Sequence, residues 1–132
     1  MKNHLSWIII TMTLLSCERN IELDEIINSN SPFIFTQRIK KVNSGQFEFI
    51  SDTLNINSEK WNELSNFLKK NHDNWKSTPA SYIPDFYIEQ DEFRLLVWKE
   101  GKTVVISFRG ENGKSEQLIK GIEKGELDFL NE

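Results

Sequence analysis

Hydrophobic and polar positions follow two different periods along this chain of 132 residues. In residues 33–38 and again in residues 47–49, aromatic or apolar side chains recur at every second position, and the polar turn residues 43–45 lie between them. A period of two is typical of a strand that buries one face. The pattern therefore predicts two antiparallel strands joined by this turn.

The period changes in residues 55–72, where the apolar positions are spaced three and four residues apart. This spacing places them along one side of a helix. Asn57 or Ser58 can cap its N-terminus, and Lys69 and Lys70 lie near the C-terminal end, where the helix dipole attracts positive charge. We expect a helix whose buried stripe consists of Trp61, Leu64, Phe67 and Leu68.

Three further short segments, residues 86–90, 93–99 and 102–108, predict strands. Turn residues separate them at 91–92 and at 100–101. The middle segment carries apolar side chains on both faces, which indicates a central strand. We therefore expect a meander whose outer face must be covered.

A second helical pattern follows the polar turn at residues 109–114. We expect a short helix over residues 115–122, since Gly121 near its end lowers helix stability by about 1 kcal/mol relative to alanine. The remaining apolar side chains should pack on the domain as a C-terminal clasp formed by Leu127, Phe129 and Leu130.

The predicted order of elements is ββαβββα. An α+β fold satisfies it, with a single antiparallel sheet of about five strands and helices packed on one face. Pro32 disfavours a preceding helix, so we place the domain at residues 32–132. A chain of this length suits one domain.

The first residues form an apolar run without a polar face. One positive charge, Lys2, precedes the run over residues 5–15, which has the length of a signal-peptide core and is well short of the roughly 20 residues that span a bilayer. The run ends in LLSC at Ser16 and Cys17, which resembles the lipobox of bacterial lipoproteins. The resemblance implies cleavage after residue 16, which makes residues 1–16 a signal peptide, and a lipid on the Cys17 thiol.

Two other interpretations of this segment stay open: an ordinary secretory signal with an incidental cysteine, and a buried N-terminal helix. The resemblance to lipoproteins explains the single cysteine of a secreted chain, because one thiol cannot form an intramolecular disulfide. It implies an envelope protein held on the membrane by the lipid on Cys17. Glu18, where aspartate would favour the inner membrane, implies the outer membrane facing the periplasm.

Residues 17–31 are polar and acid-rich, and we expect them to form a flexible tether after the lipidated cysteine. A competing expectation is a short helical turn through residues 23–27, where isoleucine and leucine cluster.

The charge balance narrows the class of partner. The chain has 16 Lys and Arg against 20 Asp and Glu. Cleavage would remove only Lys2 among them, which leaves 15 basic and 20 acidic side chains and a net charge of −5. Mild acidity argues against nucleic acid as a partner, because nucleic-acid binding needs a basic face.

Few residues offer catalytic or metal-binding chemistry. His72, the one histidine left after cleavage, lies where it would cap a helix, and no thiol remains free, so we expect no metal, no cofactor and no enzyme activity. The only candidates for a hydrolase are the carboxylates Asp85 and Glu89 beside Arg94. Residues 107–116 lack the spacing of a phosphate-binding loop, and Glu111, Asn112 and Gly113 are too few for a calcium site.

Aromatic side chains gather in and beside the proline-containing loop that follows the first helix. Trp, Tyr and Arg are the residues that dominate binding hot spots. We therefore predict a protein-binding surface, with the alternative that these aromatics close the core. The candidate contact residues are Trp75, Tyr82, Tyr87, Arg94 and Trp98.

The sequence thus favours a non-catalytic protein-binding module. Small lipid-anchored α+β domains without catalytic residues resemble immunity or inhibitor lipoproteins, which block a toxic effector or an enzyme. They also resemble accessory subunits of envelope assemblies. A small hydrolase that uses carboxylates is the remaining alternative.

Overall fold

The computed structural model describes residues 17–131. The expected signal peptide, residues 1–16, lies outside the described residues. None of the helices in the described part is both long and apolar enough to cross a membrane.

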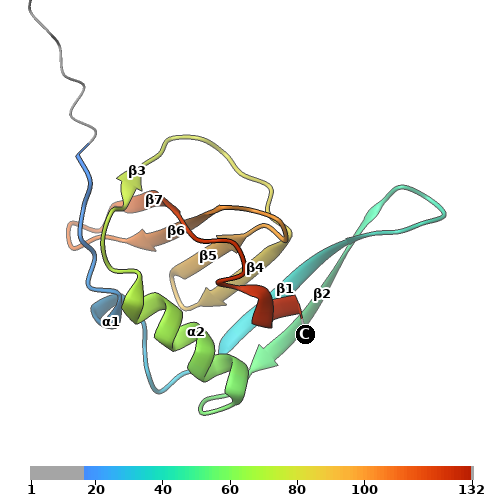
Figure 1. Cartoon of the computed structure of the whole chain (residues 1–132), viewed down its shortest axis with the longest axis horizontal. Coiled ribbons are helices and arrows are strands. Elements are labelled where there is room, and N and C mark those ends of the chain that lie inside the picture. The colour runs from blue at the N-terminus through green and yellow to red at the C-terminus, as the bar shows by residue number, and fades with distance from the viewer. Residues whose placement is uncertain (1–16, 132) are drawn as a thin grey trace, which may run out of the picture.

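One antiparallel sheet dominates the fold (Figure 1). Its strand order is β2-β1-β4-β5-β6-β7-β3. The predicted α+β class with a single antiparallel sheet is confirmed, but the sheet has seven strands rather than about five. Along the chain the elements are α1 (Leu23–Ile26), β1 (Phe33–Lys40), β2 (Phe47–Leu54), α2 (Glu59–Lys70), β3 (Lys76–Ser77), β4 (Phe86–Gln90), β5 (Phe93–Val97), β6 (Thr103–Arg109), β7 (Ser115–Gly121) and the 3-10 helix η1 (Asp128–Asn131).

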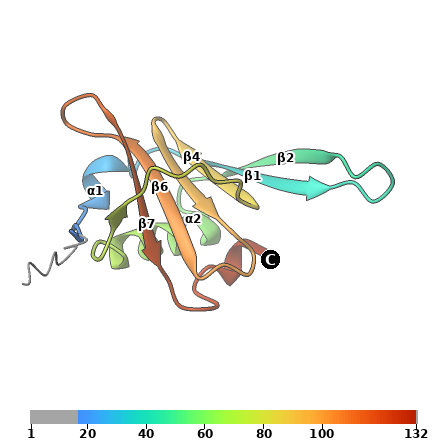
Figure 2. The same cartoon turned by 90° about the horizontal axis from the view of Figure 1, so that it is seen from above.

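Helix α2 covers one face of the sheet, with η1 beside it (Figures 1 and 2). The Ser58 side chain caps α2 by accepting a hydrogen bond from the backbone N–H of Trp61 at 3.3 Å. The predicted stripe is confirmed, since all four of its residues are buried. The buried stripe of the helix belongs to one hydrophobic core with inward side chains of the sheet, among them Phe33, Phe86, Ile88, Phe93, Leu95, Val104, Ile106 and Leu118.

The helix expected over residues 115–122 is wrong: this segment is strand β7. It pairs with β6 in the register that places Ile106 opposite Leu118 and Thr103 opposite Gly121. Seven residues are too few for a stable isolated helix, whereas the free edge of β6 offers a full ladder of hydrogen bonds. The turn between the two strands, with Gly113 at φ 75°, brings β7 alongside that edge.

The C-terminal clasp is confirmed, because Leu127 and Leu130 are buried and Phe129 packs against the core. Asn71, at the end of α2, holds the clasp in place. Its Nδ2 donates a hydrogen bond to Glu126 Oε1 at 3.0 Å, and Lys70 lies 3.7 Å from the same carboxylate.

The flexible tether expected over residues 17–31 is wrong from Arg19 onward. Arg19 and Trp75 exchange two backbone hydrogen bonds, at 2.7 and 3.1 Å, and Ile21 N–H donates to the His72 carbonyl at 2.6 Å. Ile21 and Leu23 are buried. The competing expectation of a short helical turn matches α1, whose one buried residue is Leu23.

Buried Gln90 fixes the end of the same segment. Its Nε2 donates to the carbonyls of Asn28 and Ser31 at 2.9 and 3.0 Å, and its Oε1 accepts from Asn28 N–H at 2.7 Å. The chain before β1 is therefore part of the domain. Its polar composition suggested a tether, although a few apolar side chains and backbone hydrogen bonds attach it to the rest of the domain.

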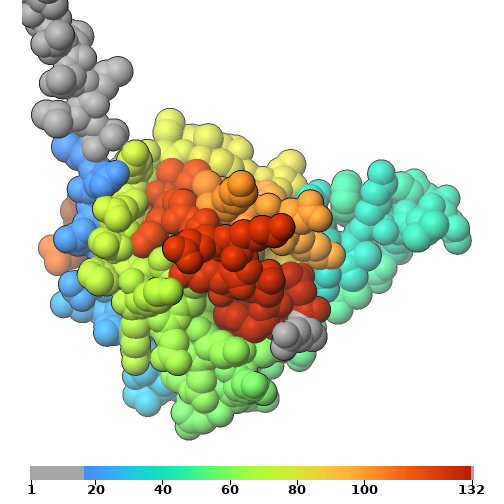
Figure 3. All heavy atoms as spheres, in the orientation of Figure 1, coloured from blue at the N-terminus to red at the C-terminus, as the bar shows by residue number. Residues whose placement is uncertain are grey.

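The β1–β2 hairpin extends beyond the rest of the molecule (Figures 1, 2 and 3). We call residues 33–54 the arm and the remaining described residues the body. The base of the arm is buried through Phe33 and Leu54, but β2 is exposed at each of its other seven positions. The predicted pairing of these two strands is confirmed.

Candidate protein-binding surface

Trp75 belongs to the core. Its side chain is fully buried, and its indole N–H donates a 2.7 Å hydrogen bond to the carbonyl of Asn71. The bridge to Arg19 covers its backbone. The prediction that Trp75 contacts a partner is therefore wrong, and the alternative that the loop aromatics close the core holds for this residue.

Tyr82 and Trp98 lie on the face of the sheet opposite α2. Their rings meet edge to face, with centroids 5.7 Å apart. The Tyr82 hydroxyl is 2.6 Å from Thr78 Oγ1, and Trp98 Nε1 donates to the Ile83 carbonyl at 3.0 Å. These contacts tie the loop to the sheet, and Figure 2 shows the loop crossing this face.

The loop supplies the cover that the outer face requires. Leu96 and Val105 are opposite each other in the register of β5 and β6, and both are buried. Gln117 Nε2, on β7, holds the loop through the carbonyls of Thr78 and Ala80 at 3.2 and 2.7 Å. Tyr82 and Trp98 are partly buried by this packing, so only part of each ring is available to a partner.

Tyr87 and Arg94 lie on the same outer face, outside the loop. The guanidinium carbon of Arg94 is 5.9 Å from the centroid of the Tyr87 ring, within the range of a cation–π contact. Arg94 Nε is also 3.5 Å from Glu89 Oε1. Half of the Arg94 side chain is exposed.

The arm continues this surface with residues that the sequence did not single out. Phe47 and Phe49 are 50% and 59% exposed. The Phe49 ring lies 6.5 Å from Tyr87, and Arg38 lies over Phe47, with its guanidinium carbon 4.4 Å from the ring centroid. Arg38 is held in place because its Nε donates to the Pro84 carbonyl at 3.1 Å.

Strand register explains why these side chains share one face. Residues directly opposite each other in an antiparallel sheet point to the same side. Arg38 is opposite Phe49, Thr36 is opposite Tyr87, and Glu89 is opposite Arg94. We call the resulting row on strands β2, β1, β4 and β5 the aromatic–arginine ladder, and it consists of Phe47, Arg38, Phe49, Tyr87 and Arg94.

Two of the five predicted contact residues, Tyr87 and Arg94, belong to the ladder. The phenylalanines of β2 were missed because their alternation with Glu48 is also that of a strand with a buried face. The one feature of the sequence that could have indicated their exposure is their position next to a polar turn, because residues near a turn are seldom covered by other elements.

The carboxylates considered for a hydrolase are not brought together. Asp85 Oδ1 lies 3.7 Å from the Arg38 guanidinium, and Asp85 Oδ2 accepts a hydrogen bond from Lys99 N–H at 2.9 Å. Glu89 pairs instead with Arg94. Each carboxylate thus has its own structural partner on the sheet surface.

An open hollow of about 960 Å³ lies between the segment around α1 and the turns that end β4 and β6. Its two arginines are both paired: Arg19 with Glu116 at 2.6 Å, and Arg109 with Glu92 at 3.2 Å. Within residues 17–131, no group of three His, Cys, Asp or Glu side chains is arranged to hold a metal ion.

Comparison of the chain with protein-family models, with curated proteins and with solved structures finds no match. The class is therefore defined by the structure alone: an α+β domain with one seven-stranded antiparallel sheet and a projecting aromatic arm.

Proposed function

We propose that this protein is a lipid-anchored bacterial envelope protein that acts, without catalysis, by binding another protein through the aromatic–arginine ladder. The observation that carries the proposal is the ladder itself. Two phenylalanines that are at least half exposed lie on one face beside a tyrosine and two arginines. Tyr and Arg are enriched at binding hot spots, and Phe is enriched at protein interfaces. Exposed aromatic clusters are typical of interaction sites.

The ladder is already ordered before a partner binds. Arg38 is fixed by Pro84 and Asp85, and Arg94 by Glu89 and Tyr87. Side chains that are held in their binding geometry lose less entropy on association. An ordered row of side chains of this kind suits contact with a folded protein.

Charge supports an inhibitor or immunity protein as the specific role. The arm has three basic and two acidic side chains, whereas the rest of the chain from Cys17 onward has 12 basic and 18 acidic ones. An acidic body would steer a basic effector or enzyme towards the protein, and the ladder would then supply the contact energy.

An accessory subunit of an envelope assembly is the second candidate. The projecting arm favours it, because an extended hairpin can reach between the subunits of a larger complex (Figure 3). The two roles differ in what binds: one soluble effector, or a membrane assembly.

The anchor is tested separately from the surface. We expect the purified protein to carry diacylglyceryl on Cys17, as measured by intact mass and by lipase-sensitive partition into detergent. The Cys17→Ala variant should lack the added mass and leave the outer-membrane fraction. An unmodified Cys17 in the wild-type protein would contradict the proposed anchor but not the proposed surface.

The surface is tested with two substitutions in the same strand. Phe49 and Ile50 are similarly exposed, at 59% and 51%, but point to opposite faces of β2. In capture from envelope extracts followed by titration of the recovered protein, Phe49→Ser should weaken binding by about 2 kcal/mol, and Ile50→Ser should leave it nearly unchanged. Equal losses, or no loss in either variant, would exclude the ladder as the binding surface.

A further inference from the structure

Strand β2 is the outer strand at one side of the sheet, and half of its backbone groups point away from β1. In an antiparallel pair, the residues that bond to a given neighbour alternate. Lys41 N–H bonds to the Gln46 carbonyl, so the even-numbered residues of β2 face β1. The N–H and C=O groups of Phe47, Phe49 and Ser51 therefore face outward.

Exposed edge strands are usually protected by being short, bulged, covered or charged, and of these devices β2 has only the two acids Glu48 and Asp52. Strand β2 has eight residues, pairs with β1 without a bulge and projects clear of the body. Along this described strand, only Thr53 has its outward N–H occupied, by Asp52 Oδ1 at 2.8 Å.

We propose that a second copy of this chain occupies the edge, with the two β2 strands antiparallel about a two-fold axis at Phe49. Phe49 then pairs with Phe49 of the second copy, and Phe47 pairs with Ser51 of the second copy. All outward groups of these three residues become bonded, and Thr53 is not required.

Charge selects this register. It places Glu48 opposite Ile50 of the second copy and Asp52 opposite Gln46, so neither acid faces another acid. If the two-fold axis lay at Ile50, Glu48 would be opposite Asp52 of the second copy, and if it lay at Glu48, that residue would be opposite its own counterpart. Like charges directly opposite each other are destabilising. Asp52 would also lie in the same cross-strand row as Lys41 of the second copy, the residue opposite Gln46.

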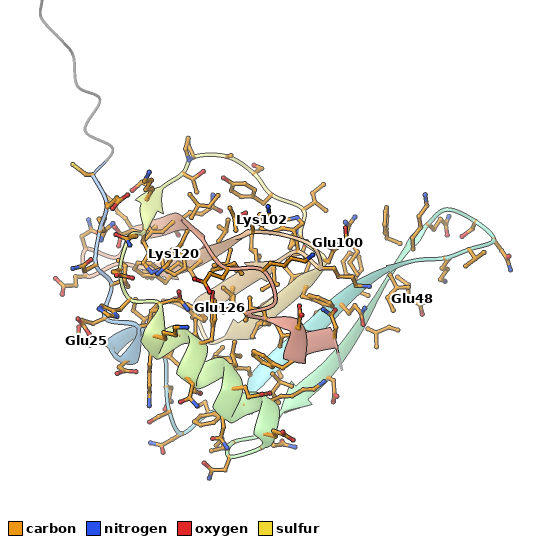
Figure 4. The ribbon with its side chains drawn as sticks, viewed as in Figure 1. Glu25, Glu48, Glu100, Lys102, Lys120 and Glu126 are labelled. Carbon is orange, nitrogen blue, oxygen red and sulfur yellow. The ribbon has the colours of Figure 1, made fainter. Side chains whose placement is uncertain are left out.

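The distribution of charge favours contact through the arm over contact through the body. The arm has a net charge of +1, whereas the rest of the chain from Cys17 onward has −6. Two bodies in contact would repel each other, and antiparallel pairing of the arms places the bodies at opposite ends. Figure 4 shows Glu48 on the arm, whereas the other labelled side chains lie on the body.

The pairing would join the ladders of two copies into one surface, with Phe49 and its counterpart at the centre. This functional consequence rests on the proposed function, whereas the pairing itself does not. A partner would then meet a surface twice as long, and binding would depend on protein concentration.

The first experiment locates the axis by cross-linking. All of the described contacts lie within residues 17–131, so the chain from residue 17 onward is used, with Cys17→Ser to remove its only thiol. Opposed residues of a hydrogen-bonded pair have Cα atoms about 5.5 Å apart, a separation that a disulfide can bridge. Under mild oxidation, Phe49→Cys should form a dimer, and Ile50→Cys, on the opposite face, should remain largely uncross-linked.

The second experiment removes a single outward N–H. Proline is tolerated at an edge position whose N–H faces away from the sheet, so Ser51→Pro should leave the β1–β2 ladder intact. Ser51→Ala is the matched control, since it also removes the 2.8 Å contact between the Ser51 and Thr36 hydroxyls. In sedimentation equilibrium, Ser51→Pro should raise the dimer dissociation constant at least about tenfold, and Ser51→Ala should raise it much less.

A monomeric wild-type chain at high micromolar concentration, together with no cross-link in the Phe49→Cys variant, would overturn the inference. So would equal cross-linking of the Phe49→Cys and Ile50→Cys variants, which indicates random collision. If the chain is monomeric and Ser51→Pro abolishes capture of another protein, that protein occupies the edge instead, which overturns the inference and retains the proposed function. Circular dichroism and thermal melting of each variant identify any that fails to fold.

Discussion

The body and the arm are built from similar alternating strands, yet their aromatic side chains have opposite environments. Phe86 and Phe93 alternate with polar residues in the body and are buried in the core. Phe47 and Phe49 alternate in the same way in the arm and are at least half exposed. Alternation reports which face a side chain occupies, but a second layer decides whether that face is covered.

The comparison also separates stability from binding. Full burial of a phenylalanine stabilises a protein by roughly 1.5–3 kcal/mol, and the arm forgoes most of this contribution. We therefore expect substitutions in the body to affect unfolding and substitutions in the arm to affect association.

The largest effect should come from Trp75→Ala. Removal of a fully buried tryptophan leaves a cavity and an unpaired carbonyl at Asn71, so we expect a loss of about 3–5 kcal/mol in the free energy of unfolding. Urea denaturation followed by circular dichroism measures it. Trp98→Ala, at a partly exposed ring on the outer face, is the control and should cost clearly less; equal losses would place both rings in one core.

A smaller loss should follow Gln90→Ala. It removes three hydrogen bonds that hold the chain at Asn28 and Ser31, and we expect a cost of about 1–3 kcal/mol. Hydrogen exchange should show faster exchange of the Asn28 amide. Gln46→Ala, at the exposed turn of the arm, is the control and should change neither the free energy of unfolding nor the exchange rate of the Asn28 amide. Unchanged exchange of this amide in Gln90→Ala would show that another contact holds the segment.

The acid side of the stability curve should depend on Glu126. Burial raises the pKa of this carboxyl, but hydrogen bonds from Asn71 Nδ2 and Glu123 N–H, with Lys70 nearby, outweigh burial and leave the pKa below its usual 4.5. A lowered folded-state pKa means that the ionised carboxylate stabilises the fold above pH 4.5, and that this contribution is lost as the pH falls through the folded-state pKa.

We therefore expect melting temperatures measured from about pH 6 to pH 3 to fall less steeply for Glu126→Gln than for the wild-type protein. A parallel fall in both would show that Glu126 carries no such contribution. Figure 4 places Glu126 in the body, so this pH dependence belongs to the body and not to the arm.

The smallest effect on stability should come from the arm. Phe47→Ser removes a ring that is half exposed and contacts mainly Arg38, so we expect a change of less than about 1 kcal/mol in the free energy of unfolding. Thermal melting measures it. A loss as large as that of Trp75→Ala would contradict the division between body and arm.

Local signals in the sequence were sufficient for much of the body. The stripe of α2 repeats at helical spacing, and the strands β4, β5 and β6 are bounded by turn residues, so both were predicted correctly. Residues 115–121 have no such local signal, since Leu118 and Ile119 suit either a short helix or a strand. The segment forms a strand because it can pair with the free edge of β6, and that edge exists only in the folded chain.

The candidate site was less predictable for the same reason. Tyr87 and Arg94 were chosen by residue type, and Trp75 was chosen by the same rule although it is buried. Phe49 joins the surface only because strand register places it beside Tyr87. Cross-strand neighbours are not encoded by spacing along the chain, so the ladder could not be assembled from the sequence.

The backbone bridge between Arg19 and Trp75 limits how a lipid-anchored form of this protein could move. Only Glu18 lies between the proposed lipid site at Cys17 and this fixed point at Arg19, so the two Cα atoms are at most about 7 Å apart. With so short a connection, the domain of the lipid-anchored form could not move far from the bilayer. It would diffuse in two dimensions close to the lipid headgroups, and any partner would have to be present in that thin layer.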